Sequence, residues 1–138
     1  MQYWIIKTEP DTYSWQTFQH EGATHWNGVR NYLARNNMRA MKKGDLVFFY
    51  HSADERRILG IARVKKEAYP DHTSDDPTWC MVDVEYVKPL EKSVSLAQIK
   101  MVPDLKNIKL VKQGRLSVGP VTEAEFTIIL GLAETSLS

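Results

Sequence analysis

The segment Asp45–His51 (DLVFFYH) decides the fold, because a continuous apolar run of this length is typical of a buried strand. The charged stretch Ala53–Arg57 that follows it predicts a turn. Ile58–Lys66 then places apolar or small residues at alternate positions, which is the pattern of a strand with one buried face. The sequence therefore predicts a β-hairpin in the middle of the chain.

Three further strands are predicted, one before this hairpin in the sequence and two after it. Met1–Lys7 is rich in aromatic and β-branched residues, Trp79–Lys88 alternates apolar and polar residues, and Leu116–Val118 is short and apolar. Glu21–Gly28 and Ala68–Thr78 are rich in polar and turn-forming residues, so we expect loops there.

Helices are predicted from their capping residues and from helical spacing of apolar side chains. Two capping boxes, in which a Ser or Thr precedes a Glu or Gln by three positions, mark helix starts in the second half of the chain. The predicted helices are Ser14–Gln19, Arg30–Met41 before Gly44, one from Ser95 and Gln98 to about Met101, and Glu123–Leu132 after Thr122.

Strands in the middle and helices nearer the ends predict an α+β domain with a mainly antiparallel β-sheet. The alternating faces of its strands would let this sheet curve into a small barrel. A chain of 138 residues fits a single core. We expect one domain over residues 1–133, followed by a loose C-terminal tail over residues 134–138.

The composition, with 43% hydrophobic and 25% charged residues, is that of a globular protein. No apolar run approaches the roughly 20 residues that a membrane-spanning helix needs, and Met1–Lys7 is too short for a secretory signal. With Cys80 as its one cysteine, the chain can form neither an internal disulfide nor a cysteine-based zinc site. We therefore expect a cytoplasmic protein with no membrane partner.

The charges are distributed unevenly. Residues 1–66 carry 11 Lys and Arg against 6 Asp and Glu, whereas residues 67–138 carry 7 against 11. One interpretation is a basic face suited to a polyanion; the other is ordinary variation of a solvated surface.

The run His25–Tyr32 (HWNGVRNY) is the first candidate for a binding site. Trp26 stands in a polar stretch just before a predicted helix, where its ring could stack on a nucleic-acid base. Asn31 offers donors and acceptors to a base edge, and Arg30 lies near a helix N-terminus that favours phosphate. The alternative is structural, with Trp26 folded onto the core and Asn31 acting as a helix cap.

Three further candidate groups lie at predicted strand ends, where binding residues often gather. Each also has an ordinary structural interpretation as a turn or as the end of a core strand. The groups are Lys7 with Thr8, Tyr50 with His51 and Ser52, and Arg115 with Ser117. His51 and Ser52 do not predict a nucleophilic pair, because neighbours on a strand point to opposite faces.

Several chemistries lack their sequence signatures. The chain has no glycine pattern for phosphate or dinucleotide binding, and its four histidines match no zinc motif. Asp71, Asp75 and Asp76 lack the spacing of a calcium loop, so we expect a solvated acidic loop. We expect no catalytic residues, no metal and no cofactor.

A set of motifs extends from residue 2 to about residue 132. They are Tyr3–Pro10 (YWIIKTEP), Trp26–Asn36 (WNGVRNYLARN), Met41–Asp45 (MKKGD), Phe49–Ser52 (FYHS), Gly60–Ile61, Tyr69–Asp71 (YPD), Leu96–Lys100 (LAQIK) and Arg115–Val118 (RLSV). In content and order they resemble the EVE domain family of the PUA-like superfamily, which includes small stand-alone members and is related to the YTH readers of methylated RNA.

The resemblance implies a PUA-like fold, with a curved or barrel-like sheet flanked by helices. It also implies a non-catalytic module that binds DNA or RNA and recognises a modified base, in the first place a modified cytosine. The candidate groups above would then converge on one pocket at one rim of the sheet. Thr8 stands where such proteins often have Ser, so no preference for one modification is carried over.

The binding mode expected from this resemblance starts with a base that is unpaired or leaves its stack. Trp26 would stack on it near Tyr50, while Asn31 and the hydroxyl of Thr8 or Ser117 would read its polar edge. Residues expected to hold phosphates are Arg30, Arg35, Arg39, Lys42 and Lys43.

Three alternatives stay open at this point. The first is a binder of a small metabolite or free modified nucleoside that uses the same pocket. The second is an enzyme acting on modified nucleotides, which would need a nucleophile and base that the motifs do not supply. The third is a scaffold whose surface binds another protein.

Overall fold

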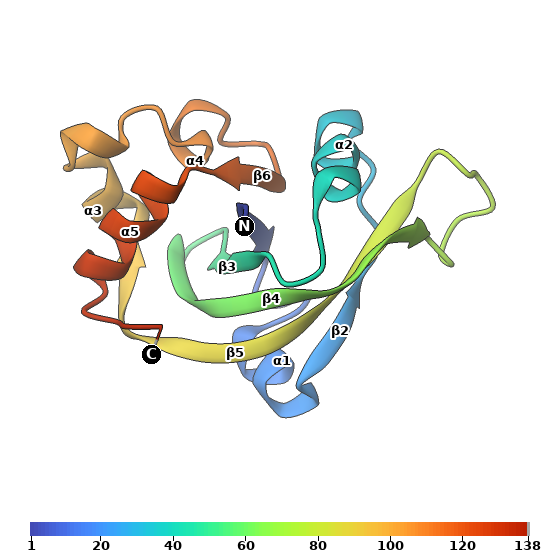
Figure 1. The fold of residues 1–138 in the computed structure, drawn as a ribbon, viewed down its shortest axis with the longest axis horizontal. Coiled ribbons are helices and arrows are strands. Elements are labelled where there is room, and N and C mark those ends of the chain that lie inside the picture. The colour runs from blue at the N-terminus through green and yellow to red at the C-terminus, as the bar shows by residue number, and fades with distance from the viewer. Residues whose placement is uncertain (138) are drawn as a thin grey trace.

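Six strands form one sheet in the order β2-β5-β4-β3-β1-β6 in the computed structural model, which describes residues 1–137 (Figure 1). The strands are β1 (Tyr3–Thr8), β2 (Ala23–Trp26), β3 (Leu46–His51), β4 (Arg57–Pro70), β5 (Cys80–Ser95) and β6 (Val118–Val121). The helices are α1 (Trp15–Glu21), α2 (Tyr32–Ala40), α3 (Leu96–Lys100), α4 (Lys109–Lys112) and α5 (Glu123–Leu132), with a 3₁₀ turn η1 (Pro103–Leu105). The predicted α+β class with a mainly antiparallel sheet is confirmed.

One strand pair is parallel, and it determines where the ends of the strands meet. β1 pairs with β3 from Tyr3 opposite Leu46 to Thr8 opposite His51, whereas the other neighbouring pairs are antiparallel. The carboxyl ends of β1 and β3 therefore lie at the same edge of the sheet, which we call the carboxyl rim. The predicted strand-end groups at Thr8 and His51 are neighbours there.

The sheet curves around one hydrophobic cluster. β4 and β5 are long, and their pairing shifts register at several points, which bends the strands. All six strands contribute side chains to the same cluster, as do α1 and α2. Its members include Trp4, Trp26, Phe49, Val64, Val84 and Val118. Because β1 and β2 both supply this cluster although three strands separate them in the sheet, they face each other across its interior.

The curved sheet does not close on itself within residues 1–137, since β2 pairs only with β5 and β6 only with β1. α2 contacts β6 on one side and β5 and β4 on the other, and so occupies the gap. The Asn37 side-chain amide donates to the Val118 carbonyl (2.8 Å), which joins α2 to β6. The barrel allowed by the sequence is thus completed by a helix.

A second cluster covers the outer face of the sheet. Phe48 and Ile61 point into it, and α3, α4 and α5 supply the other side. The rings of Phe48 and Phe126 stack with their centroids 4.3 Å apart. Figure 1 shows these three helices gathered at one end of the molecule, away from α1 and α2. β3 is buried along its whole length because its two faces belong to the two clusters.

The helix starts predicted from capping residues are confirmed. Ser14 caps α1 through the Thr17 N–H, and complete capping boxes begin α3 and α5. α2 starts later than predicted, at Tyr32, because Asn31 is its N-cap, and it ends at Ala40, one residue before the predicted Met41. The short segments η1 and α4 carry no strong start signal, and the sequence did not predict them.

The predicted loop over Glu21–Gly28 is wrong, because Ala23–Trp26 forms the edge strand β2. Edge strands tolerate polar residues, since one of their sides stays open. β4 also extends to Pro70, into the predicted loop over Ala68–Thr78, and β5 continues to Ser95 beyond the predicted Lys88. In each case pairing with a neighbouring strand overrides the local turn propensity.

The C-terminal segment is held against β5. The Thr135 hydroxyl accepts from the Glu91 N–H (2.8 Å), and the Ala133 carbonyl accepts from the Lys92 N–H (3.1 Å). Of the expected tail over residues 134–138, Ser138 lies outside the described residues. Within residues 1–137, no helix has both the length and the apolar character to cross a membrane.

Gly60 is required by the way α1 packs on the sheet. A Cβ at this position would lie 2.1 Å from the Trp15 ring, which is buried and has no room to move away. We expect Gly60→Ala to lower the free energy of unfolding by about 1–3 kcal/mol in a urea titration, as overpacked cores do. Gly131→Ala is the matched control, because a Cβ there meets nothing within 4 Å. An equal loss in both variants would contradict this account.

Candidate functional site

A cavity of about 500 Å³ opens at the carboxyl rim, between the end of β1 and β2. Its size is within the range of pockets that hold small ligands or nucleotides. The curvature of the sheet creates it, because β1 and β2 face each other there. Its walls are Lys7, Thr8, Glu9, Thr12, Tyr13, Thr24, His25, Trp26, Asn27, Gly28, Val29, Arg30 and Ser117.

The aromatic wall of this cavity is formed by Trp26 and Tyr13. Trp26 is 8% exposed and packs edge-on against Phe49 (5.7 Å) and Tyr13 (6.0 Å between ring centroids). Trp26 therefore belongs to the core, as its structural interpretation predicted, and it also lines the cavity. The Tyr13 hydroxyl donates to Glu21 (2.5 Å), and burial together with this carboxylate raises the pKa of Tyr13 to about 12.

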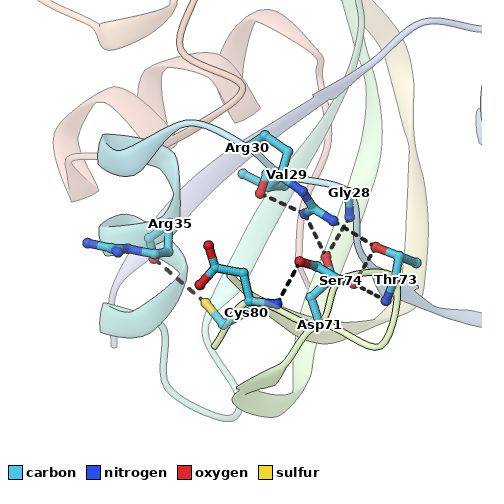
Figure 2. A network of polar contacts seen from close by, with 9 residues as sticks. Gly28, Val29, Arg30, Arg35, Asp71, Thr73, Ser74 and Cys80 are labelled. Atoms are coloured by element: carbon cyan, nitrogen blue, oxygen red, sulfur yellow. Dashed lines mark hydrogen bonds and ion pairs between the residues drawn. The ribbon is translucent and has the colours of Figure 1, made fainter. Parts of the chain in front are cut away.

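A buried aspartate holds the loop that forms one side of the cavity. Asp71, between β4 and β5, accepts hydrogen bonds from the Gly28 N–H (2.8 Å), the Arg30 guanidinium (3.0 Å) and the Thr73 N–H and hydroxyl (2.7 and 2.5 Å). Figure 2 shows these groups converging on the carboxylate. Asp71 thus ties the loop between β2 and α2 to the end of the long β4–β5 hairpin.

The interpretation of Asp71 as part of a solvated acidic loop is wrong, since it is 2% exposed; Asp75 and Asp76 are indeed exposed. Burial by itself raises the pKa of the Asp71 carboxyl. The hydrogen bonds from Thr73, Gly28 and Arg30 outweigh burial and hold this pKa well below its usual range. Asp71 is therefore a charged anchor inside the protein.

Five of the predicted base-binding residues line the cavity together: Lys7, Thr8, Trp26, Arg30 and Ser117. The Lys7 ammonium donates to the Gly114 carbonyl (2.8 Å), and burial lowers the pKa of this ammonium. The Lys7 N–H donates to the Ser117 carbonyl (2.9 Å). Lys7 therefore fixes the segment that carries Ser117, a residue of the cavity wall.

Tyr50, His51 and Ser52 reach the carboxyl rim as expected, but the structure does not place them in this cavity. Tyr50 faces the outer cluster, and with Ser52 it lines a neighbouring cavity of about 340 Å³. His51 points inward and is buried, where its Nε2 accepts from the Trp15 N–H (2.9 Å) and its Nδ1 meets Glu55 (2.8 Å). The alternation of a strand separates the three side chains.

Asn31 and Arg115 also lie outside the cavity. The Asn31 side chain caps α2 by accepting from the Ala34 N–H (2.9 Å), which is its structural interpretation. Asn31 and Arg115 line another depression together, between the start of α2 and the segment before β6. Apart from the buried His51, the predicted base-binding residues are thus distributed over three adjoining cavities rather than one.

The predicted phosphate contacts divide into two groups. Arg35 and Arg39 lie one turn apart on α2 and are not part of the cavity wall, whereas Lys42 and Lys43 precede β3. Because β3 runs parallel to β1, those lysines lie at the opposite end of the sheet from Thr8. A six-residue strand spans about 20 Å, so the structure does not bring them to the cavity.

Sequence reasoning missed several lining residues. Glu9 and Asn27 are exposed polar residues in turn segments, where local patterns do not reveal which way a side chain points. His25 contacts Asp83 through Nδ1 (2.7 Å), and the Tyr69 hydroxyl bonds to the same carboxylate. Burial raises the pKa of Asp83, but these two hydrogen bonds outweigh it and lower that pKa. Among residues 1–137, no three His, Cys, Asp or Glu side chains are grouped to hold a metal ion.

A curved sheet completed by a helix, with a cavity at its rim, defines a PUA-like domain. The chain matches the EVE domain family over residues 2–132, and it belongs to this family. The human relative thymocyte nuclear protein 1 is 37% identical, and the match covers 96% of this chain and 74% of the relative.

Two solved structures place the fold among its relatives. Protein Atu2648 from Agrobacterium tumefaciens is 42% identical with a TM-score of 0.96, covering 98% of this chain and 94% of that one. Human THYN1 in complex with 5-methylcytosine-containing DNA is 35% identical with a TM-score of 0.91, covering 99% of both chains. A YTH domain of Zygosaccharomyces rouxii, 15% identical with a TM-score of 0.62 and covering 99% of this chain and 88% of that one, shares the fold.

The anchoring role of Asp71 predicts a pH-dependent effect on stability. Asp71→Asn removes a charge that accepts four hydrogen bonds, and we expect it to lower the free energy of unfolding at pH 7 by about 1.5–3 kcal/mol. Because the folded-state pKa of Asp71 lies below its unfolded value, its contribution is complete above about pH 4 and is lost as the pH falls further.

Urea titrations between pH 3 and pH 7 check this expectation. Asp75→Asn is the matched control, since Asp75 is exposed in the same loop. The difference between wild type and Asp71→Asn should shrink at the acid end, while Asp75→Asn should follow the wild type throughout. A difference that does not depend on pH would show that the Asp71 charge is not the stabilising feature.

Proposed function

We propose that this protein binds nucleic acid through a modified base, a modified cytosine, held in the cavity between β1 and β2, and that it catalyses no reaction on that base. The observation that carries the proposal is the Trp26 ring in the wall of a cavity that is large enough for a nucleotide. The complex of human THYN1 with 5-methylcytosine-containing DNA, on the same fold, supports it.

An unpaired or extruded base would enter the cavity and contact Trp26 and Tyr13. Extrusion from a duplex costs a few kcal/mol, so single strands or weakened pairs are favoured. A methyl group buried against these rings contributes about 0.8 kcal/mol, which corresponds to a several-fold preference. The cavity therefore has to obtain further selectivity from polar groups.

Glu9 supplies the polar group best suited to cytosine. It is exposed at the cavity wall, and only its backbone carbonyl is used in the turn, where it accepts from the Thr12 and Tyr13 N–H groups (2.9 and 3.0 Å). Its carboxylate is thus available to accept from the exocyclic amine of cytosine, which thymine and uracil lack. Thr8 and Ser117 line the same wall, and the Thr8 hydroxyl, which donates to the Glu9 carbonyl (3.3 Å), can still accept a hydrogen bond from the base edge.

The loss of the Trp26 ring should weaken binding of the modified base. With Trp26→Leu, we expect a 5- to 100-fold lower affinity for a single strand carrying 5-methylcytosine, measured by fluorescence anisotropy at two salt concentrations. Trp15→Phe is the matched control, because Trp15 belongs to the same cluster but does not line the cavity. Circular dichroism should verify that both variants are folded.

Two outcomes would contradict the stacking role. One is an equal loss of affinity in Trp26→Leu and Trp15→Phe, and the other is no loss in either. If the wild type instead binds a free nucleoside with no dependence on salt and no oligonucleotide, the cavity is a small-molecule site.

Glu9 should determine the choice of pyrimidine. Glu9→Ala is expected to lower the affinity for a 5-methylcytosine strand about tenfold and to leave a thymine strand unchanged, because only cytosine offers an amine. Asp11→Ala controls for the removal of a negative charge, since Asp11 is exposed nearby and does not line the cavity. Equal effects on both strands would exclude Glu9 as the reader of that amine.

A further inference from the structure

An aromatic pair lies beside the cavity, with one ring exposed and the other half-buried. Tyr32, the first residue of α2, and Trp79, just before β5, have ring centroids 5.2 Å apart with 33° between the ring planes. Tyr32 is 63% exposed, so the core does not account for its position. A large aromatic side chain left in water next to a ligand cavity, as Tyr32 is, is a candidate for ligand contact.

Arginine side chains flank both rings. The guanidinium carbon of Arg30 lies 5.6 Å from the centre of the Trp79 ring, and that of Arg35 lies 5.1 Å from the centre of the Tyr32 ring. Arg39, one turn beyond Arg35, donates to the carbonyl of Thr78, the residue before Trp79 (3.3 Å). We call the side chains of Tyr32, Trp79, Arg35 and Arg39 the aromatic ridge.

The positive charge of the ridge is not compensated by carboxylates. Among the ion pairs of residues 1–137, none involves Arg35 or Arg39. Arg35 donates instead to the neutral Asn36 side chain from Nε (3.1 Å) and from Nη2 (2.7 Å). Figure 2 shows the Arg35 side chain directed away from the network around Asp71. Both charges are therefore available to an anionic partner.

Arg30 connects the ridge with the cavity. Its guanidinium lines the cavity, is fixed by Asp71 and lies near the Trp79 ring. A ligand that leaves the cavity past Arg30 therefore reaches the ridge next. An unpaired nucleic-acid strand has the matching chemistry, because its bases present π-faces and its phosphates are anionic at regular spacing.

We propose that the aromatic ridge stacks the base adjacent to the one held in the cavity, and that Arg35 and Arg39 contact phosphates of the same strand. This inference rests on the proposed function of the cavity and extends it. The cavity identifies one base, whereas the ridge accepts any neighbouring base, because every base has a π-face.

Binding should therefore be compared on ligands with and without that neighbouring base. The probes are 5-methyl-dCMP, a nine-residue DNA single strand with a central 5-methyl-dC, and two strands of the same length with an abasic residue on the 5′ or the 3′ side of it. Tyr32→Ala is the main variant, and Trp79→Ala is the second. Tyr32→Phe keeps the ring, and Met101→Ala, at an 82% exposed residue outside both sites, controls for the loss of a large surface side chain.

We expect Tyr32→Ala and Trp79→Ala to bind the intact strand 5- to 100-fold more weakly than the wild type. The same variants should match the wild type on 5-methyl-dCMP and on one of the two abasic strands, since these ligands lack the stacked neighbour. Tyr32→Phe and Met101→Ala should behave as the wild type on every probe.

Two results would overturn the ridge alone. One is wild-type affinity of Tyr32→Ala and Trp79→Ala for the intact strand, and the other is an equal loss on the intact strand, both abasic strands and the mononucleotide. A wild type that binds no probe at all would overturn the proposed function of the cavity and this inference with it.

Discussion

The curvature of the sheet is the constraint on which the rest of this structure depends. β3 is buried on both faces, so each side of the sheet must be covered: one by α3, α4 and α5, the other by the sheet bending around its own aromatic cluster. Flat sheets leave edge strands far apart, whereas the bulges in β4 and β5 bring β2 across from β1. The cavity is the part of this interior that side chains do not fill at the carboxyl rim.

Polar residues near the rim divide into those that hold the site and those left for a ligand. Asp71, Lys7 and Asn31 each use their side chains on backbone groups, and they fix the segments that carry Gly28, Ser117 and α2. An anchor of this kind is most effective when it is buried and fully hydrogen-bonded, because both features restrict its motion. Side chains that bind a ligand should instead be free of hydrogen bonds within the protein. A side chain that is already hydrogen-bonded must lose that partner before it can bind the ligand.

The sequence predicted the fold better than it predicted the site, for a physical reason. Capping boxes at Ser95 and Thr122 and the apolar run of β3 depend on neighbours in the chain, and these predictions are confirmed. β2 depends on pairing with β5, and the burial of Asp71 depends on a loop 43 residues away, so local patterns did not reveal either. The strand-end groups reached the expected rim, but alternation directed Tyr50 and His51 into different surroundings.

Arg30 illustrates why affinity and selectivity need not come from the same contacts. The carboxylate of Asp71 partly neutralises its charge, so it contributes less to long-range attraction than an unpaired arginine would. What it gains is a fixed orientation, because three of its hydrogen bonds are made within the protein. Arg35 and Arg39 of α2, which form no ion pair among residues 1–137, attract a polyanion over a Debye length. Arg30 and the cavity wall have a fixed geometry, which only a base of matching shape can fit. Attraction by charges without an ion pair and discrimination by an ion-paired arginine are thereby assigned to different residues of the same short segment.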